Sequence, residues 1–262
     1  MELFAQIYDY ILLTMTVLGV VVFIILQFVT PAYGMTFNNR WGVSVRSNLG
    51  WFIMEAPVFF SMFLLYFISL YYNIHPFNIV TFVMFFFFEF HYFQRSFIFP
   101  LLMKGQSKMP ISIIITGFIF NTFNAFMQGG WLFYFCPQDG YPISWFWSWQ
   151  FILGTSIFLF GMVINIYADR VIRNLRKDIT DNNYYLPMGW PFNKISSANY
   201  TGEILEWAGF ALLTWSISGA VFLLWTCANI IPRSKAVYER YTQFFGKEFT
   251  DLKRYKLFPG IY

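Results

Sequence analysis

Residues 205–231 read LEWAGFALLTWSISGAVFLLWTCANII, and the way this stretch folds decides the architecture of the chain. It is apolar over a longer distance than the roughly 20 residues that one membrane-spanning helix needs. Near its middle, the residues SISG at 216–219 are of the kind at which helices end. Two structures are therefore open: one long tilted helix, or a hairpin of two helices that breaks near these residues.

Composition places the rest of the chain in a membrane as well. Of the 262 residues, 58% are hydrophobic, 24% aromatic and only 11% charged, which is far from the averages of soluble domains. The first apolar stretch is expected to remain in the protein. A cleavable signal peptide has basic residues before its apolar run, and here no Lys or Arg precedes that run. This first stretch covers residues 8–29, and further stretches of spanning length cover residues 49–72, 78–99, 111–135 and 145–167. We predict one integral membrane domain over residues 1–262.

The basic residues decide between the two structures of 205–231. They lie in residues 30–48 as Arg40 and Arg46, around the end of the third apolar stretch, between 168 and 204, and after 232. Because basic loops stay in the cytoplasm, the N-terminus is predicted outside and the C-terminus inside. Both flanks of 205–231 are then cytoplasmic, which requires an even number of crossings.

We therefore predict the hairpin, with a first helix from around Thr201 and a second that continues past Pro232 toward Phe245. The single tilted helix would place the C-terminal tail outside. The predicted fold is all-α and polytopic, with seven transmembrane helices.

Several classes of site are disfavoured. The two cysteines form no CxxC motif or disulfide framework, and His75 and His91 lack the spacing of metal ligands, so we expect no metal. A sequence pI near 9.0 reflects basic cytoplasmic loops, and we expect no nucleic-acid partner. Neither a GxGxxG nor a Walker loop is present, so any nucleotide binds outside those frameworks.

Ionisable residues at membrane depth are costly and usually face a cavity or one another. Glu55 is expected about one turn inside the second helix, close to Pro57. Glu89, Tyr92 and Arg95 recur at helical spacing and form one polar stripe. Tyr92 alone is also compatible with an interfacial aromatic, and Arg95 with an anchoring residue at the membrane surface. Glu89 is expected to pair with Arg95 or His91 and has no catalytic role.

The segment 165–206 is the densest polar region. Asp169, Arg173 and Arg176 are spaced to share one face at the cytoplasmic end of the fifth helix. Such a group can be a stop-transfer cluster. It can also be an anion site, because guanidinium groups suit phosphate while carboxylates and amides suit ribose and carboxamide groups.

Several segments together resemble the steroid 5α-reductase family, the 3-oxo-5α-steroid 4-dehydrogenases, in a form typical of bacteria. The most specific part is the ordered block Leu186-Pro-Met-Gly, Asn199-Tyr-x-Gly-Glu203 and Glu206-Trp207, which follows Asn165 and Asp169. The other matching segments are 51–55, 91–95, 124–129, 165–177, 232–241 and 253–259. The resemblance covers nearly all of the chain after the first helix.

This resemblance implies seven helices, NADPH entering from the cytoplasm and a steroid entering from the bilayer. It also implies that Glu55 and Tyr92 bind the steroid carbonyl and that residues 145–262 form most of the cofactor site. The implied cofactor contacts are Trp51, Arg95, Asn165, Asp169, Arg173, Arg176, Tyr184, Asn199, Glu203 and Tyr241. Val237 and Tyr238 occupy a stretch in which animal members carry a histidine cluster. The resemblance leads us to expect an asparagine at Met103 and, near the cofactor, an arginine at Gln106.

The expected reaction is reduction of the 4,5 double bond of a 3-oxo-4-ene steroid, with hydride added at the β-carbon. Reduction of another lipid enone, such as an enoyl thioester or a polyprenal, is the alternative. A membrane methyltransferase is a further alternative, which the Glu55 and Tyr92 pair disfavours. A lipid transporter would need neither this pair nor a nucleotide site. We expect a monomer in contact with membrane lipid, in a bacterial cytoplasmic membrane or in the endoplasmic reticulum, with its active site open to the cytoplasm.

Overall fold

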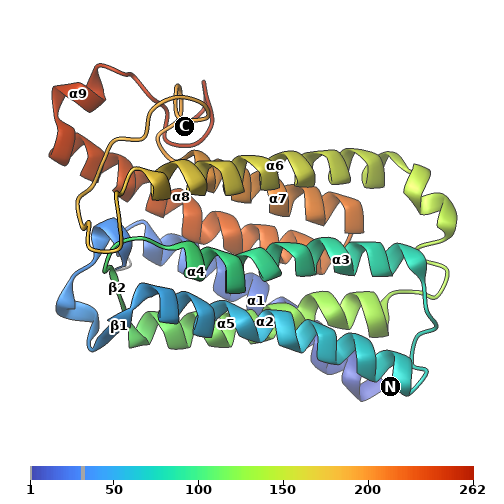
Figure 1. The fold of residues 1–262 in the computed structure, drawn as a ribbon. Helices are drawn as coiled ribbons and strands as arrows, with labels where there is room; N and C mark the ends of the chain where they lie inside the picture. Colours follow the sequence, from blue (N-terminus) through green and yellow to red (C-terminus); the bar gives the residue numbers. More distant parts are fainter. Residues whose placement is uncertain (1, 31–32) are drawn as a thin grey trace.

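A computed structural model describes residues 2–30 and 33–262 of the chain as a mostly helical protein (Figure 1). Residues 31 and 32, in the predicted 30–48 loop, lie outside the described part. The longer helices are α1 (Glu2–Leu26), α2 (Ser47–Tyr71), α3 (Ile79–Phe93), α5 (Ile111–Gly130), α6 (Trp149–Asn174), α7 (Ala198–Thr214) and α8 (Ile217–Phe245). The shorter elements are α4 (Phe99–Leu102), α9 (Lys247–Thr250), the π-helical turns Gln94–Ile98 and Trp131–Phe135, the 3₁₀ turns Gly34–Thr36, Asn39–Trp41 and Ile143–Trp147, and the strands β1 (Ser44–Arg46) and β2 (Lys108–Pro110).

The stretch 205–231 breaks into two helices, as its charged flanks predicted. Helix α7 ends where Trp215 adopts a left-handed conformation, with φ of 46°. Ser216 then caps α8, because its hydroxyl oxygen accepts a hydrogen bond of 3.0 Å from the backbone N–H of Gly219. Helix α8 continues through Pro232 to Phe245, so the chain reverses direction within one apolar stretch.

The helices form a bundle with its polar loops at one end (Figure 1). The β1–β2 pair, the 175–197 loop and α9 gather there, while the N-terminus lies at the opposite end. Helix α6 packs chiefly on α7, α2 on α5, and α1 on α8. The loops predicted to share the cytoplasmic side therefore share one end of the molecule.

Helix α2 differs slightly from its prediction. It begins at Ser47, so Glu55 lies about two turns inside the helix instead of one. Pro57 does not interrupt α2, which runs to Tyr71. Glu55 is consequently deeper in the apolar bundle than the sequence suggested.

Within the residues that the structure describes, four helices are long and apolar enough to cross a membrane. They are Glu2–Leu26, Ser47–Tyr71, Ile111–Phe135 and Trp149–Asn174. This finding fits a membrane protein. That α3, α7 and α8 cross as well, to make seven spans, stays a prediction.

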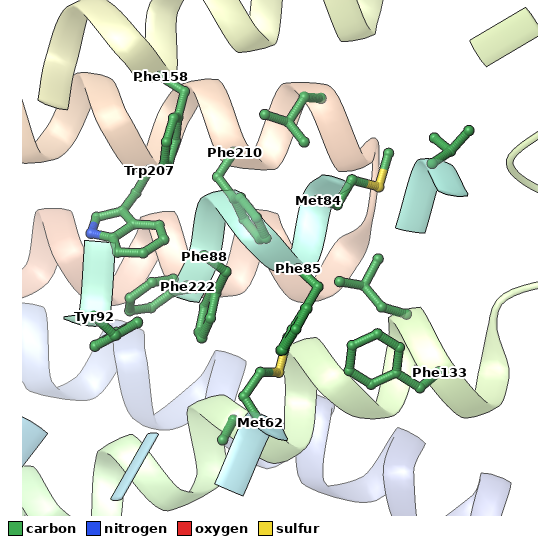
Figure 2. Packing of buried hydrophobic residues seen from close by; sticks show 14 of the residues in the cluster. Met62, Met84, Phe85, Phe88, Tyr92, Phe133, Phe158, Trp207, Phe210 and Phe222 are labelled. Atoms are coloured by element: carbon green, nitrogen blue, oxygen red, sulfur yellow. The ribbon is translucent and has the colours of Figure 1, made fainter. Parts of the chain in front are cut away.

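Large aromatic side chains fill the centre of the bundle (Figure 2). Phe88 of α3 contacts Trp207 and Phe210 of α7 and Phe222 of α8, with ring centroids 5.5–6.4 Å apart. Tyr92, one turn after Phe88, lies at the edge of this group, and its ring centroid is 4.8 Å from that of Phe88. The aromatic cluster therefore holds Tyr92 in a dry environment.

Glycines bring the backbones of α6 and α7 into direct contact. A Cβ atom added at Gly161 would overlap the backbone of Gly202 and Glu206, and one added at Gly154 would overlap Gly209 and Leu213. Small residues of this kind are what allows helices in membranes to approach closely. The contact sets the spacing of the polar residues at the loop end of both helices.

We predict that Gly161→Val separates α6 from α7 and lowers stability, because overpacking of a tight interface costs about 1–3 kcal/mol. Ser156→Ala, at an exposed position of α6, is the matched control. Thermal unfolding of the purified protein in detergent should show a melting temperature lower by several degrees for Gly161→Val alone. Equal melting temperatures for the two variants would contradict the backbone contact.

Candidate active site

Two asparagines of α5 hold the predicted carbonyl-binding residues. Asn121 Nδ2 donates hydrogen bonds to Glu55 Oε2 at 3.0 Å and to the carbonyl oxygen of Met54 at 2.8 Å. One turn later, Asn124 Nδ2 donates to the Tyr92 hydroxyl oxygen at 3.1 Å. Since both amides belong to one face of α5, Glu55 of α2 and Tyr92 of α3 are brought to neighbouring levels of the bundle.

The orientation of both amides follows from their other partners. A carbonyl oxygen only accepts, so the group of Asn121 that faces Met54 must be the NH₂ group. The Oδ1 atom of Asn124 accepts from Gln128 Nε2 at 3.3 Å, and Gln128 also donates to the carbonyl oxygen of Ser218 at 2.9 Å. The NH₂ group of Asn124 is therefore left for Tyr92, and both asparagines act as donors.

Arg95 occupies the centre of a second, charged group. Its Nη1 atom lies 3.2 Å from Asp169 Oδ2, and its Nη2 atom lies 3.8 Å from Glu203 Oε2. The guanidinium carbon is 4.5 Å from the ring centroid of Trp51 and 4.6 Å from that of Phe99. Arg95 thus joins the predicted cofactor residues of α2, α6 and α7.

The polar residues of α6 and α7 bind one another across the glycine contact. Asn165 Nδ2 donates to the backbone carbonyl of Asn199 at 3.0 Å. Asn199 Nδ2 in turn donates to Asp169 Oδ1 at 3.1 Å, so each carboxylate oxygen of Asp169 has its own donor. The close approach of the two helices is what makes these short bonds possible.

A cavity of about 230 Å³ lies next to this network, at the loop end of the bundle. Six of the ten predicted cofactor residues line it: Asp169, Arg173, Arg176, Tyr184, Asn199 and Tyr241. Lys104 lines it as well. Arg95, Asn165 and Glu203 do not line the cavity but belong to the bonded network behind it, and Trp51 packs on Arg95.

Arg176 also ties two loops together. Its Nη1 atom donates to the carbonyl oxygen of Lys104 at 2.7 Å, and Lys104 Nζ donates to the carbonyl oxygen of Arg176 at 2.9 Å. The ring of Tyr184 lies 5.7 Å from the Arg176 guanidinium, and its hydroxyl donates to Gly34 O at 3.2 Å. One wall of the cavity is thus fixed by cross-links between loops.

Two aspartates, the exposed Asp178 and the half-buried Asp181, order the loop beside this wall. The Thr180 hydroxyl lowers the pKa of Asp178, and a backbone N–H bond from Lys177 is the main cause that lowers the pKa of Asp181. Both carboxylates therefore stay ionised at neutral pH. The Tyr185 hydroxyl donates to Asp181 Oδ2 at 3.0 Å, which keeps the loop close to Tyr184.

Arg233 was not among the predicted site residues, although it lines the cavity. Its Nε atom donates to the Tyr200 hydroxyl at 2.7 Å, its Nη2 atom donates to Tyr33 O at 3.1 Å, and its guanidinium covers the Tyr33 ring. Its Nη1 atom is buried and has no partner among the described residues, and the same is true of the hydroxyl of Ser197, which lines the same cavity. The sequence placed Arg233 among cytoplasmic basic residues, and nothing there signals its burial.

Neither asparagine was among the predicted site residues, although Asn124 begins the segment 124–129 that resembles the family. Asn121 was not singled out, although Asn121, Asn124 and Gln128 recur at helical spacing inside an apolar stretch. Three amides on one face of an otherwise apolar helix are a signal that could have found them.

The predicted pairing of Glu89 is wrong. His91 Nδ1 lies 2.7 Å from Glu206 Oε1, and Arg95 is engaged by Asp169 and Glu203. Carboxyl groups of α6 and α7 thus engage both His91 and Arg95, while the two oxygens of Glu89 have no hydrogen-bond partner among the described residues. Within residues 2–30 and 33–262, no three His, Cys, Asp or Glu side chains come together in a way that could hold a metal ion.

The fold and the site define a helical protein that fits a membrane, with a cationic cavity at one end and a buried tyrosine and carboxyl pair nearby. The family model described as 3-oxo-5-alpha-steroid 4-dehydrogenase matches residues 107–262. The chain belongs to this family, the steroid 5α-reductases, as the sequence indicated.

Relatives of plants and mammals match over most of their lengths. The chain is 33% identical to "Steroid 5-alpha-reductase DET2" of Arabidopsis thaliana, over 97% of each chain. It is 34% identical to the protein of the same name from Gossypium hirsutum, again over 97% of each. It is 36% identical to "3-oxo-5-alpha-steroid 4-dehydrogenase 1" of Rattus norvegicus, over 84% of this chain and 83% of the relative. The family is a reductase family, which implies a nicotinamide cofactor.

Proposed function

We propose that the protein reduces the 4,5 double bond of a 3-oxo-4-ene steroid with NADPH, by hydride addition at the β-carbon. Family membership supports the reaction class. The single observation that carries the mechanism is the pair of hydrogen bonds from Asn121 and Asn124 to Glu55 and Tyr92.

In this proposal, the two asparagines leave Glu55 and Tyr92 free to donate to the substrate. Burial in an apolar bundle disfavours a carboxylate, so Glu55 is neutral. With Asn121 donating to Oε2, the proton of Glu55 resides on Oε1. Asn124 donates to the Tyr92 oxygen, so the phenol hydrogen is available to another acceptor. Both hydrogens are directed at the carbonyl oxygen of the steroid.

Two fixed donors stabilise the charge that develops during reduction. Addition of hydride to the β-carbon of an enone moves negative charge to the carbonyl oxygen, and preorganised donors in a dry site favour that change. The carbonyl oxygen becomes that of an enolate, which Tyr92 and Glu55 hold. The α-carbon then takes a proton, from water or from an acid not yet identified, and the ketone re-forms.

The cavity residues fit an anionic nucleotide. Arg173, Arg176 and Lys104 would bind phosphate, since guanidinium and ammonium groups are suited to that task. The donors of Arg233 and Ser197, which have no partner in the described part of the chain, could serve further acceptors. The remaining predicted contacts would bind the ribose and the nicotinamide group of the cofactor, with Trp51 and Arg95 beside the nicotinamide ring. Bound NADPH supplies the hydride. Most of these residues lie in 145–262 of the single membrane domain.

The proposed topology has seven crossings, the N-terminus outside and the C-terminus in the cytoplasm. The cationic cavity at the loop end is then open to cytoplasmic NADPH, and the steroid enters from the bilayer. We propose a monomer in a bacterial cytoplasmic membrane or in the endoplasmic reticulum. An enoyl thioester or a polyprenal offers the same conjugated carbonyl to Glu55 and Tyr92, and remains the alternative substrate class.

Consumption of NADPH, followed by its absorbance after addition of a 4-ene-3-ketosteroid to purified protein, tests the function. Turnover supports the proposal. Turnover with an enoyl thioester or a polyprenal but not with the steroid would shift the proposal to the alternative class.

We predict that reporters fused after Tyr262 and inside the 178–198 loop both lie in the cytoplasm, because basic residues flank both positions. A reporter fused before Glu2 should lie outside and serves as the control. A C-terminal reporter on the outer side would contradict the crossing of α7 and α8.

We predict that Arg176→Ala raises the Michaelis constant for NADPH, and that Asn199→Ala and Glu203→Ala weaken binding of both NADPH and NADH. Arg170→Ala, an exposed position on the same helix as Asp169, is the control and should leave these constants unchanged. Because Arg176 also ties two loops, the melting temperature of its variant is measured alongside. If the three site variants bind NADPH like wild type, the nucleotide site is misplaced.

We predict that loss of one donor to the carbonyl lowers turnover by about two orders of magnitude, equivalent to ~3 kcal/mol. Glu55→Gln keeps a donor of similar size and should retain more activity than Glu55→Ala. Tyr92→Phe should lose turnover with little change in affinity for NADPH, while Tyr10→Phe, at an exposed position of α1, should change neither. Equal inactivity of Glu55→Gln and Glu55→Ala, with cofactor and steroid still bound, would exclude a neutral donor.

A further inference from the structure

One buried carboxyl takes no part in the proposed mechanism. Glu89 is only 5% exposed, yet neither of its oxygens has a hydrogen-bond partner among the described residues. The other buried carboxyls of the bundle are engaged: Glu55 by Asn121, Glu206 by His91, and Asp169 by Arg95 and Asn199. Buried polar groups in native proteins are nearly always bonded, and exceptions inside membranes tend to mark function.

The neighbours of Glu89 on α3 show which way it faces. Phe85 and Phe93 lie one turn before and one turn after it, on the same stripe of the helix. Phe85 packs on Phe63 of α2 at 5.1 Å between ring centroids, and Phe93 packs on Phe59 of α2 at 6.2 Å. Glu89 therefore lies in the interface between α3 and α2.

The same contacts show where Glu89 lies relative to Glu55 and Tyr92. Phe59 is one turn after Glu55 on α2, and Glu89 is about one turn before Tyr92 on α3. Because α2 and α3 run in opposite directions, both steps lead away from the loop end of the bundle (Figure 1). Glu89 thus lies about 5 Å further along the helix axis than Tyr92, on the side away from the cofactor cavity.

The surroundings restrict what Glu89 can bind. A carboxylate without a cation is strongly disfavoured in an apolar interface, so the group is neutral and can both donate and accept one hydrogen bond. Exposure of 5% leaves too little surface for a second protein copy, and acyl chains offer no partner. The remaining candidate partner of Glu89 is a small neutral polar group on a molecule bound inside the bundle. A hydroxyl fits, because it can both donate a hydrogen bond to a carboxylic acid and accept one from it.

We infer that Glu89 binds a hydroxyl group on the ring system of the substrate, so that the preferred substrate is a hydroxylated enone. This inference rests on the proposed function. The one-turn separation from Tyr92 places the hydroxyl on the fused rings near the enone, and not on a side chain at the far end. The apolar faces of the same rings contact the phenylalanines that flank Glu89.

The test compares androst-4-ene-3,17-dione with its derivatives that carry one hydroxyl at carbon 6, 7 or 11. Wild type should turn over at least one derivative with a higher kcat/KM than the parent steroid. In Glu89→Met, kcat/KM for that derivative should fall about tenfold more than for the parent, which is the worth of one hydrogen bond to a buried group. Glu89→Gln, which keeps a donor and an acceptor, should recover part of the loss.

Phe90→Met, at an exposed position of the same helix, is the control and should leave the preference unchanged. The melting temperature of Glu89→Met should not fall, because no protein contact is lost. A fall of several degrees would show that Glu89 has a structural partner, and would overturn the inference. Equal loss for parent and derivative, or no preference in wild type, would overturn it as well.

The two proposals fail in different ways. If wild type reduces the parent steroid without preferring any hydroxylated form, the function stands and the role of Glu89 is refuted. If wild type consumes no NADPH with any of these steroids, the proposed function fails and the inference falls with it.

Discussion

At Gly154 and Gly161 the backbone of α6 touches that of α7, and the polar groups of the site depend on this contact. It lets Asn165 and Asp169 reach Asn199, and it brings Glu203 and Glu206 of α7 to the side that faces α3. His91 of α3 and Arg95, in the π-helical turn that follows α3, contact these two carboxyl groups. Side chains larger than hydrogen at these glycines would move the helices apart and separate the partners.

The site has two parts, which differ in the partners that their polar side chains have in the apolar bundle. The cations at the loop end are matched by carboxylates or face a cavity, which suits an anionic cofactor. Further into the bundle, the side-chain hydrogen bonds of Glu55 and Tyr92 with other described residues come from amides, which suits neutral donors to a carbonyl oxygen. A charged reactant and an apolar one can thus meet at the boundary between the two parts, and Glu89 extends the neutral part by one turn.

The sequence predicted the helices well, because apolar stretches and basic loops are the dominant signals in a membrane protein. The break of 205–231, which the structure has at Trp215 and Ser216, followed from its charged flanks together with the residues SISG at 216–219. Six predicted cofactor residues line one cavity, since the family resemblance carried their roles. Arg233 and the pairing of His91 with Glu206 were missed because they depend on which helices pack together, and local spacing contains no such information. For the same reason Glu89 was assigned the wrong partners.

Transfer of deuterium tests the central claim, that hydride reaches the β-carbon of an enone whose oxygen is held by Glu55 and Tyr92. Purified protein is incubated with androst-4-ene-3,17-dione and NADPH deuterated at the transferable position of its nicotinamide ring, and the product is examined by NMR and mass spectrometry. The account predicts one deuterium at carbon 5, a solvent proton at carbon 4, and the same labelling at about one hundredth of the turnover for Tyr92→Phe. Deuterium at any other carbon, or unchanged turnover in Tyr92→Phe, would contradict it.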